Sequence, residues 1–385
     1  MKYLRQISET IKQSKSSILL LGPRQTGKST LIRDLNPDLS INLAQEKVFL
    51  SFSSQPELLE QMIQQEKPKT IFIDEIQRLP SLLNTIQAII DENPRKIKFF
   101  LTGSSARKLK RGSANLLPGR VISLQMAPLS LEELKYKFNI DQAIAHGLLP
   151  GIYVEKNLKE KELLLSSYGA TYLKEEVQAE ALTKNIEGFS RFLFVLASKN
   201  AEFVDYAKLG SQSGVTQKTA TRFFEILEDS LLIFRLESYS KSSQRRLVQH
   251  PKFYFFDTGV LNSLLGSYKV TADRRGKLFE TFVIVAIRNM LISHSVQFRM
   301  STYRTTNGGE VDLILEVNGT EFAIEIKASK NIGKSDIRGL AGFSEVSNNN
   351  PIKMIIYLGE YGKKIEDVSV LPLVQAMKML ASYCS

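Results

Sequence analysis

The sequence has little cysteine, a deficit of acidic residues and no long apolar run. Its single cysteine, Cys384, excludes an intrachain disulfide and predicts a reducing compartment, which we take to be the cytoplasm. No apolar stretch approaches the roughly 20 residues that a membrane-spanning helix needs. Residues 1–10 alternate charged and apolar side chains, so we expect no signal peptide and no membrane partner.

The acid deficit points to a polyanionic partner. The chain carries 51 Lys and Arg against 40 Asp and Glu, a formal net charge of +11. Such an excess suits DNA, although a generally basic protein would also carry it. At 385 residues the chain is too long for one ordinary core, so two or three domains are expected. A hydrophobic content of 43% indicates folded domains rather than disorder.

The strongest motif follows a predicted buried strand at residues 17–21 and precedes the start of a predicted helix at 30–32. Between them stands the P-loop pattern G-x-x-x-x-G-K-[ST]. The two glycines permit a loop whose backbone N–H groups surround a polyphosphate such as that of ATP, with Lys28 reaching the β- and γ-phosphates and Ser29 ligating Mg²⁺. The alternative is an ordinary glycine-rich turn. We expect nucleotide contacts from the whole loop: Gly22, Pro23, Arg24, Gln25, Thr26, Gly27, Lys28, Ser29 and Thr30.

Two further apolar segments end in polar residues. Residues 70–73 precede Asp74 and Glu75, the Walker B arrangement, in which Asp74 holds Mg²⁺ and Glu75 acts as general base. Residues 97–101 precede Thr102 and Ser104, one of which could sense the γ-phosphate. A capping role at the next helix is the alternative for this pair.

Together with the Pro-Gly-Arg sequence ending at Arg120, these motifs resemble a prokaryotic AAA+ ATPase. The resemblance makes Arg120 a candidate arginine finger that inserts into a neighbouring subunit of a homo-oligomer. A surface position or a local salt bridge is the alternative. The resemblance also implies a small helical lid, which we place at residues 129–186.

Residues 187–250 predict a winged helix-turn-helix. A helix over 203–209 is followed by a second one that begins near Thr216 and carries Lys218 and Arg222 on its polar side. A basic loop containing Arg245 and Arg246 would form the wing. These four side chains are the predicted nucleic-acid contacts, although winged helices also serve in protein binding.

Two alternating runs flank Asn318-Gly319, the strongest short hairpin signal. A two-residue turn pairs Val317 with Thr320, so paired positions sum to 637 and Asp312 stands opposite Glu325. Opposed carboxylates repel each other unless a cation lies between them. Glu316 and Glu321 are also opposed, but that pair lies beside the turn, where we expect water to screen it.

The order Glu280, Asp312, Glu325, Lys327 resembles the PD-(D/E)XK nuclease core, and residues 251–259 resemble the segment that introduces such a tail after many prokaryotic AAA+ domains. By this resemblance Asp312 and Glu325 would ligate Mg²⁺ or Mn²⁺ with help from Glu280, and Lys327 would orient the attacking water. A nuclease-like fold used only for binding is the alternative.

These predictions combine into an α/β protein. We expect an AAA+ (ASCE) parallel sheet at 1–128, a helical lid at 129–186, a winged helix at 187–250 and a restriction-endonuclease-like domain at 251–385. The protein would hydrolyse ATP with Mg²⁺ and couple its nucleotide state to DNA engagement, with DNA cleavage by the last domain as a further activity. The alternative is a nucleotide-dependent DNA- or protein-binding switch whose nuclease-like domain is not catalytic.

Overall fold

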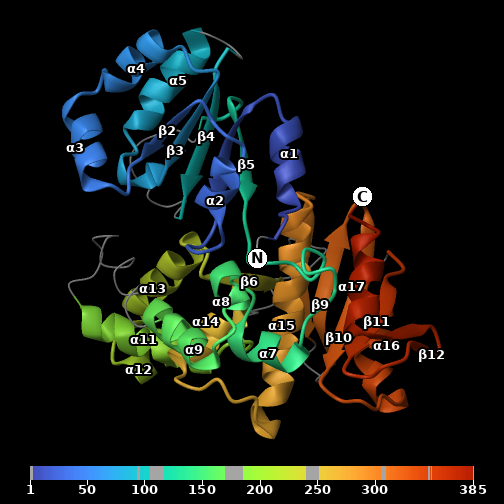
Figure 1. Cartoon of the computed structure of the whole chain (residues 1–385). Helices are drawn as coiled ribbons and strands as arrows, with labels where there is room; N and C mark the ends of the chain where they lie inside the picture. The colour runs from blue at the N-terminus through green and yellow to red at the C-terminus, as the bar shows by residue number, and fades with distance from the viewer. Residues whose placement is uncertain are drawn as a thin grey trace. The chain divides into compact units, whose positions relative to one another are not determined.

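A computed structural model of the chain describes residues 3–92, 96–104, 117–169, 185–239, 251–304, 309–345, 347 and 349–384. The chain divides into two compact units (Figure 1). Unit 1 comprises residues 1–128 and 226–232, and unit 2 comprises 129–225 and 233–385. No helix among the described residues is both long enough and apolar enough to cross a membrane.

Unit 1 has a parallel five-stranded sheet in the order β2-β3-β4-β1-β5, which confirms the expected α/β class with a parallel sheet. β4 therefore lies between the P-loop strand β1 and the Walker B strand β3. The strands are β1 (Ser17–Leu21), β2 (Leu39–Asn42), β3 (Thr70–Asp74), β4 (Lys98–Gly103) and β5 (Val121–Gln125). The helices are α1 (Ile7–Gln13), α2 (Lys28–Arg33), α3 (Glu46–Ser54), α4 (Leu58–Glu66), the 3-10 turn η1 (Ile76–Arg78) and α5 (Leu82–Glu92).

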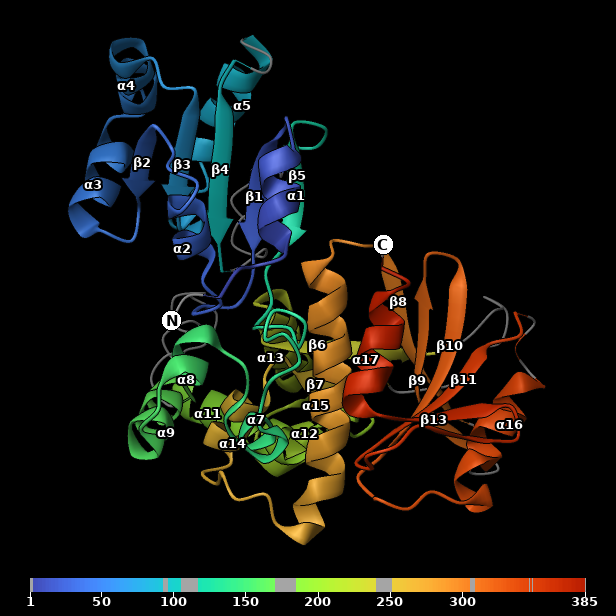
Figure 2. The same ribbon diagram turned by 45° about the vertical axis from the view of Figure 1, so that its right-hand side comes forward.

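Alternate residues of these strands enter two separate cores. Leu19, Ile71 and Phe99 pack with side chains of α3, α4 and α5 on one face. Ile18 and Phe72 pack with α1 and α2 on the other. Because both faces are covered, the strands are apolar throughout, as is typical of parallel sheets. The helices on either side of the sheet can be followed in Figure 2.

Unit 2 begins with helical segments and contains the predicted lid and helix-turn-helix. Its helices before the large sheet are α7 (Ile140–His146), α8 (Pro150–Val154), α9 (Leu158–Ser167), α11 (Ile186–Ser198), α12 (Tyr206–Ser213) and α13 (Gln217–Asp229), the last of which ends within unit 1. Helix α13 begins where the sequence predicts, because the hydroxyl of Thr216 accepts a hydrogen bond from the N–H of Thr219 (3.2 Å).

An eight-stranded sheet in the order β12-β13-β11-β10-β9-β8-β6-β7 forms the rest of unit 2. Its strands are β6 (Ile233–Ser238), β7 (Lys252–Phe255), β8 (Phe298–Arg304), β9 (Glu310–Val317), β10 (Thr320–Lys327), β11 (Ile352–Tyr357), β12 (Lys363–Ile365) and β13 (Val368–Pro372). The accompanying helices are α14 (Thr258–Leu264), α15 (Ala272–Ser293), η3 (Lys334–Ile337), α16 (Arg338–Ser344) and α17 (Leu373–Ala381). Helices α15 and α17 lie side by side against the sheet (Figures 1 and 2).

The hairpin register expected from Asn318-Gly319 is confirmed. Val317 pairs with Thr320 and the ladder continues to Leu313 and Ile324, every pair summing to 637. Beyond that pair, the N–H of Ile326 donates its hydrogen bond to a side chain, the Oδ2 atom of Asp312 (2.8 Å), instead of to the backbone of β9.

Two local expectations are wrong. The helix expected over 203–209 begins only at Tyr206, because Asp205 caps it and Phe203 instead forms an antiparallel bridge with Lys252. Glu321 is not screened by water. It is buried and its carboxylate accepts hydrogen bonds from Tyr239 (2.9 Å) and Ser347.

The predicted division at residues 250 and 251 falls between β6 and β7, which are antiparallel neighbours in one sheet.

Asp257 fastens α14 to the loop after α7. Its buried carboxylate accepts hydrogen bonds from the N–H groups of Gly259 (2.9 Å), Val260 (3.1 Å) and Leu148 (2.7 Å). The third bond joins residues 109 positions apart. Asp257 therefore holds part of the predicted lid and the C-terminal half of the chain in one body.

Replacing Asp257 with Ala should lower the free energy of unfolding of unit 2 by about 3 kcal/mol, because three buried N–H groups lose their acceptor. Asp205→Ala is the matched control. Asp205 also caps a helix, but it is exposed and accepts one bond, from the N–H of Lys208, so about 1 kcal/mol is expected. Urea unfolding would measure both, and equal losses would contradict the role assigned to Asp257.

Candidate functional site

The loop between β1 and α2 has the conformation that a phosphate-binding loop needs. Gln25 (φ 61°) and Gly27 (φ 93°) adopt left-handed backbone conformations. Gly22 is required by close approach, since a Cβ atom there would lie 2.2 Å from the carbonyl oxygen of Met126. Within the loop Pro23 and Thr26 are buried, Arg24 is partly buried, and Gln25 and Thr30 are exposed.

Lys28 lies inside this loop. Its buried Nζ atom donates hydrogen bonds to the carbonyl oxygens of Gly22 (2.8 Å) and Pro23 (2.9 Å). Both acceptors are neutral, so phosphate oxygens can replace them without leaving a buried charge unpaired.

Asp74 contacts three other side chains of the site. Its Oδ1 atom accepts hydrogen bonds from the hydroxyls of Ser29 (2.7 Å) and Thr102 (2.5 Å), and its Oδ2 atom lies 3.3 Å from a guanidinium nitrogen of Arg33. Asp74 is only 4% exposed. The adjacent hydroxyl of Ser29 and carboxylate of Asp74 are hard oxygen ligands that fit Mg²⁺. Arg33 carries no motif signal and was not predicted from the sequence.

Glu75 follows Asp74 in a left-handed backbone conformation (φ 58°), which is uncommon for a residue with a side chain and frequent at functional sites. Its N–H donates to the hydroxyl of Thr102 (3.3 Å). Its carboxylate accepts a hydrogen bond from the amide of Gln77, which also donates to Ser104 (3.0 Å). Thr102 therefore contacts Asp74, whereas Ser104 reaches Glu75 through Gln77.

Arg120 forms a bidentate ion pair with Asp91. The guanidinium Nε and Nη2 atoms donate to the two carboxylate oxygens at 2.6 and 3.0 Å. A local salt bridge of this kind is the alternative to an arginine finger that the sequence analysis names. An arginine acting on a neighbouring subunit would first have to break this pair.

The polar side of α13 is accessible within the described residues. Lys218 and Arg222 are exposed, and the apolar residues Phe223 and Phe224 are buried. The predicted wing residues Arg245 and Arg246 lie outside the described residues.

The C-terminal acids meet around a lysine that the sequence did not single out as functional. The ammonium group of Lys252 lies 2.7 Å from Glu280, 3.4 Å from Glu310 and 3.9 Å from Asp312. Glu280 also accepts a hydrogen bond from the hydroxyl of Tyr254 (2.7 Å). Beside them, Lys327 pairs with Glu325 at 2.6 Å. We call Lys252, Glu280, Glu310, Asp312, Glu325 and Lys327 the acidic centre.

Burial and the crowding of like charges shift the pKa values of groups in the acidic centre. Burial, Glu325 and Glu280 together raise the pKa of Asp312 well above its usual range, against the opposing effect of Lys252. Burial also raises the pKa of Glu325 although Lys327 opposes it. Burial alone would lower the pKa of Lys252, but Glu280 and Asp312 reverse the shift and raise it.

In the described part of the chain, no three or more His, Cys, Asp or Glu side chains are placed to hold one ion. Glu280 and Asp312 both lie near the ammonium group of Lys252, and metal binding by Asp312 and Glu325 stays a prediction. Lys252, which the sequence did not single out, lies within residues 251–259. The only signal in those residues was their resemblance to the segment that introduces a nuclease-like tail after many AAA+ domains.

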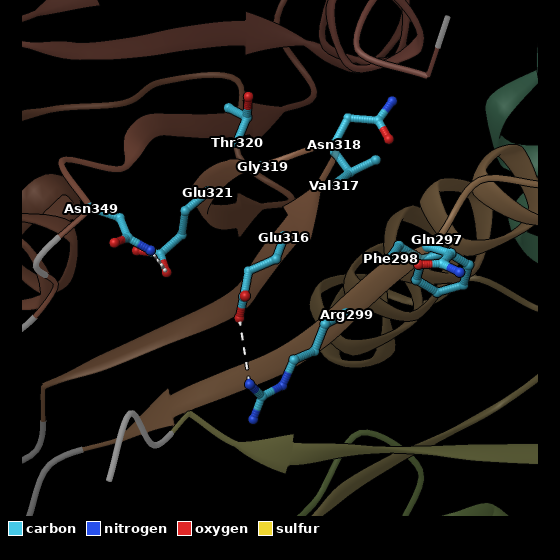
Figure 3. A pocket seen from close by; sticks show the side chains of 10 residues that line it. All are labelled: Gln297, Phe298, Arg299, Glu316, Val317, Asn318, Gly319, Thr320, Glu321 and Asn349. Carbon is cyan, nitrogen blue, oxygen red and sulfur yellow. Dashed lines mark hydrogen bonds and ion pairs between the residues drawn. The ribbon is translucent and has the colours of Figure 1, made fainter.

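A cavity of about 510 Å³ lies at the turn end of the β9–β10 hairpin, where Figure 3 shows its lining side chains. The opposed acids Glu316 and Glu321 turn to different partners there. Glu316 faces Arg299 (3.8 Å), and Glu321 accepts from the amide of Asn349 (3.4 Å). Glu321 is therefore paired in a buried position, whereas the side chain of Glu316 is 38% exposed beside Arg299.

Comparison with protein families divides the chain into three. Residues 14–135 match a family model described as an AAA domain. Residues 137–270 and 275–376 match two domains of unknown function. The AAA match covers most of unit 1, and the parallel sheet of that unit agrees with an AAA-type fold.

Relatives share the organisation of most of the chain. An uncharacterized protein of Mycobacterium tuberculosis is 26% identical over 80% of this chain and 70% of its own length. One of Methanocaldococcus jannaschii is 23% identical over 90% of this chain and 83% of its own. Among solved structures, the replication initiator DnaA bound to AMPPCP and single-stranded DNA is 11% identical, with a TM-score of 0.27 over 58% of this chain and 85% of that one. That score is too low to carry any conclusion.

Arg5 supports the P-loop from outside the motif. Its buried guanidinium donates to the carbonyl oxygens of Thr26 and Ala127, both at 2.6 Å. Arg5→Ala should therefore destabilise unit 1 by about 2–3 kcal/mol and weaken nucleotide binding. Lys12→Ala, an exposed position that pairs only with Glu9 within the described contacts, should change stability by less than about 0.5 kcal/mol. Thermal unfolding and fluorescent-nucleotide titration would measure both, and similar behaviour of the two variants would contradict the role of Arg5.

Proposed function

We propose that unit 1 binds ATP with Mg²⁺ and hydrolyses it. The observation that carries the proposal is the contact of Asp74 with both Ser29 and Thr102. It joins the P-loop, the Walker B strand and the intervening strand at one point. Loops at the carboxyl ends of parallel strands are where such folds bind ligands.

Different residues of unit 1 have separate roles in ATP binding and hydrolysis. Lys28 exchanges its two carbonyl acceptors for phosphate oxygens, and the backbone of residues 22–27 surrounds the polyphosphate. Ser29 and Asp74 would hold Mg²⁺, which would neutralise charge on the phosphates when bound. Glu75 takes the proton of the attacking water, and Gln77 holds its carboxylate in place. Thr102 orients Asp74.

We propose that the nucleotide state controls the engagement of DNA by unit 2. The net charge of +11 and the exposed Lys218 and Arg222 on α13 support this proposal. Arg245 and Arg246 stay predicted contacts. The protein-binding role of the helix-turn-helix is the competing proposal. Arg120 stays a candidate arginine finger of a homo-oligomer, although its pair with Asp91 favours a local structural role.

Metal-dependent DNA cleavage by unit 2 is the less favoured proposal. It needs Asp312 and Glu325 to share a metal ion, and each of them already lies near an ammonium group: Asp312 near Lys252 (3.9 Å) and Glu325 near Lys327 (2.6 Å). We therefore favour a nuclease-like domain that binds without cutting.

Two substitutions separate nucleotide binding from turnover. Lys28→Ala should lose ATP binding, because the phosphates lose their buried positive partner. Glu75→Gln should bind ATP normally but turn it over about 10²–10⁴-fold more slowly, since the amide cannot accept the proton. Glu60→Gln changes an exposed glutamate of the same unit and should behave as wild type. Phosphate release and nucleotide titration measure these properties, and undiminished turnover by Glu75→Gln would refute the base assignment.

The DNA proposal is tested by a double substitution of Lys218 and Arg222 to Ala. Loss of two phosphate contacts should weaken duplex binding about tenfold or more and make its dependence on salt less steep by about 1–2 in logarithmic slope. Lys12→Ala with Lys15→Ala removes the same charge from unit 1 and should have little effect. Fluorescence anisotropy at several salt concentrations makes the comparison. Equal weakening by both pairs would indicate a general charge effect instead.

A further inference from the structure

Lys252 is an unusual lysine because it is 4% exposed. Lysine is almost never fully buried unless it is paired, since removing an ammonium group from water carries a large free-energy penalty. Its Nζ atom is surrounded by Glu280, Glu310 and Asp312 at 2.7–3.9 Å. The pairing explains how this burial is tolerated.

The acidic centre nevertheless holds more acidic than basic side chains. It holds four carboxylates, those of Glu280, Glu310, Asp312 and Glu325, against two ammonium groups, those of Lys252 and Lys327. Glu325 is 9% exposed, and its buried Oε2 atom has no hydrogen-bond partner among the described residues. Such a group points to a cation as the partner that the centre prefers.

A divalent ion does not fit the centre as it stands. Magnesium and manganese prefer about six oxygen ligands, but one carboxylate oxygen of each of three acids here already meets a donor of the chain. Lys252 and Tyr254 meet Oε1 of Glu280, Ile326 donates to Oδ2 of Asp312, and Lys327 meets Oε1 of Glu325. A metal ion would have to displace the ammonium group of Lys252 from three carboxylates.

The backbone around Lys252 holds the side chain in place. Lys252 forms a bridge with Phe203, and the carbonyl oxygen of Pro251 accepts a hydrogen bond from the N–H of Val204 (2.8 Å). On its other side, the carbonyl oxygen of Phe253 accepts from the N–H of Ala201 (2.9 Å). The strand is thus fixed on the segment between α11 and α12, so Lys252 cannot leave the acids through a small backbone shift.

We propose that Lys252 is the resident cation of the acidic centre and closes it to divalent metal ions, which bind there only when its ammonium group is removed. This proposal concerns unit 2 alone and does not depend on ATP hydrolysis by unit 1. It assigns the three carboxylates around Lys252 to holding a lysine. The resemblance to metal-dependent nucleases would have assigned Asp312 to a metal ion together with Glu325, with help from Glu280.

The test is Lys252→Met in the full-length, nucleotide-free protein, titrated with Mn²⁺ and followed by electron paramagnetic resonance. Methionine fills a similar volume without charge, so the carboxylates lose their internal partner. The variant should gain a site that binds Mn²⁺ about tenfold or more tightly than any nucleotide-free site of the wild type. Adding Asp312→Asn to the variant should remove that site again.

Lys161→Met is the matched control. Lys161, on α9, is 6% exposed, so its substitution removes the charge of another buried lysine of unit 2. It should gain no Mn²⁺ site. A gain by both variants would overturn the proposal, because it would reflect net charge alone. The absence of any gain in folded Lys252→Met would overturn it too.

Should Lys252→Met fail to fold without metal, recovery of its folded circular-dichroism spectrum on adding Mn²⁺ would support the proposal. The wild type gives an independent measurement. Nucleotide-free wild type should bind no Mn²⁺ that depends on Asp312. A wild-type site that is lost in Asp312→Asn would overturn the proposal whether or not the lysine variant folds.

Discussion

In each unit of this protein one buried lysine lies among oxygen acceptors, Lys28 in unit 1 and Lys252 in unit 2. Lys28 meets two backbone carbonyls within the loop that follows β1. Lys252 meets three carboxylates contributed by α15 and β9. Other contacts hold in place the segments that carry these two lysines. In unit 1, Arg5 and the approach of Met126 fix the loop, and in unit 2 the bridge to Phe203 fixes the strand.

The nature of the acceptors decides how each lysine behaves. A hydrogen bond from a charged ammonium group to a neutral carbonyl contributes a net of about 1.5–3 kcal/mol. A polyphosphate offers charged acceptors, so it can take the place of the carbonyls around Lys28. Breaking a buried ion pair by removing one partner costs about 3–5 kcal/mol, so the acids around Lys252 do not release it readily. The first centre can therefore open to a ligand, whereas in the second a lysine of the chain already pairs with three of the four acids. Two centres that look alike in sequence as anion-handling sites differ in this respect.

Local patterns predicted much of the fold, because their physics lies within a few residues. The P-loop spacing fixed the strand-loop-helix unit, and Asn318-Gly319 fixed a register that holds pair by pair to Leu313 and Ile324. Arg33, Gln77 and Lys252 could not be predicted in the same way. Each contributes through a partner that only tertiary folding brings near, such as Glu280, which lies 28 positions after Lys252 in the chain. The buried state of Glu321 was missed for the same reason, since Tyr239 and Ser347 reach it from distant segments.

The central claim is that one centre accepts a metal with its nucleotide and the other contains its own cation. Equilibrium dialysis of wild-type protein with Mn²⁺ and a non-hydrolysable ATP analogue tests it most directly by counting bound ions per chain. The account predicts a single ion, present only with nucleotide and lost when Ser29 is replaced by Ala. Two ions, one of them retained without nucleotide and lost when Glu325 is replaced by Gln, would contradict it.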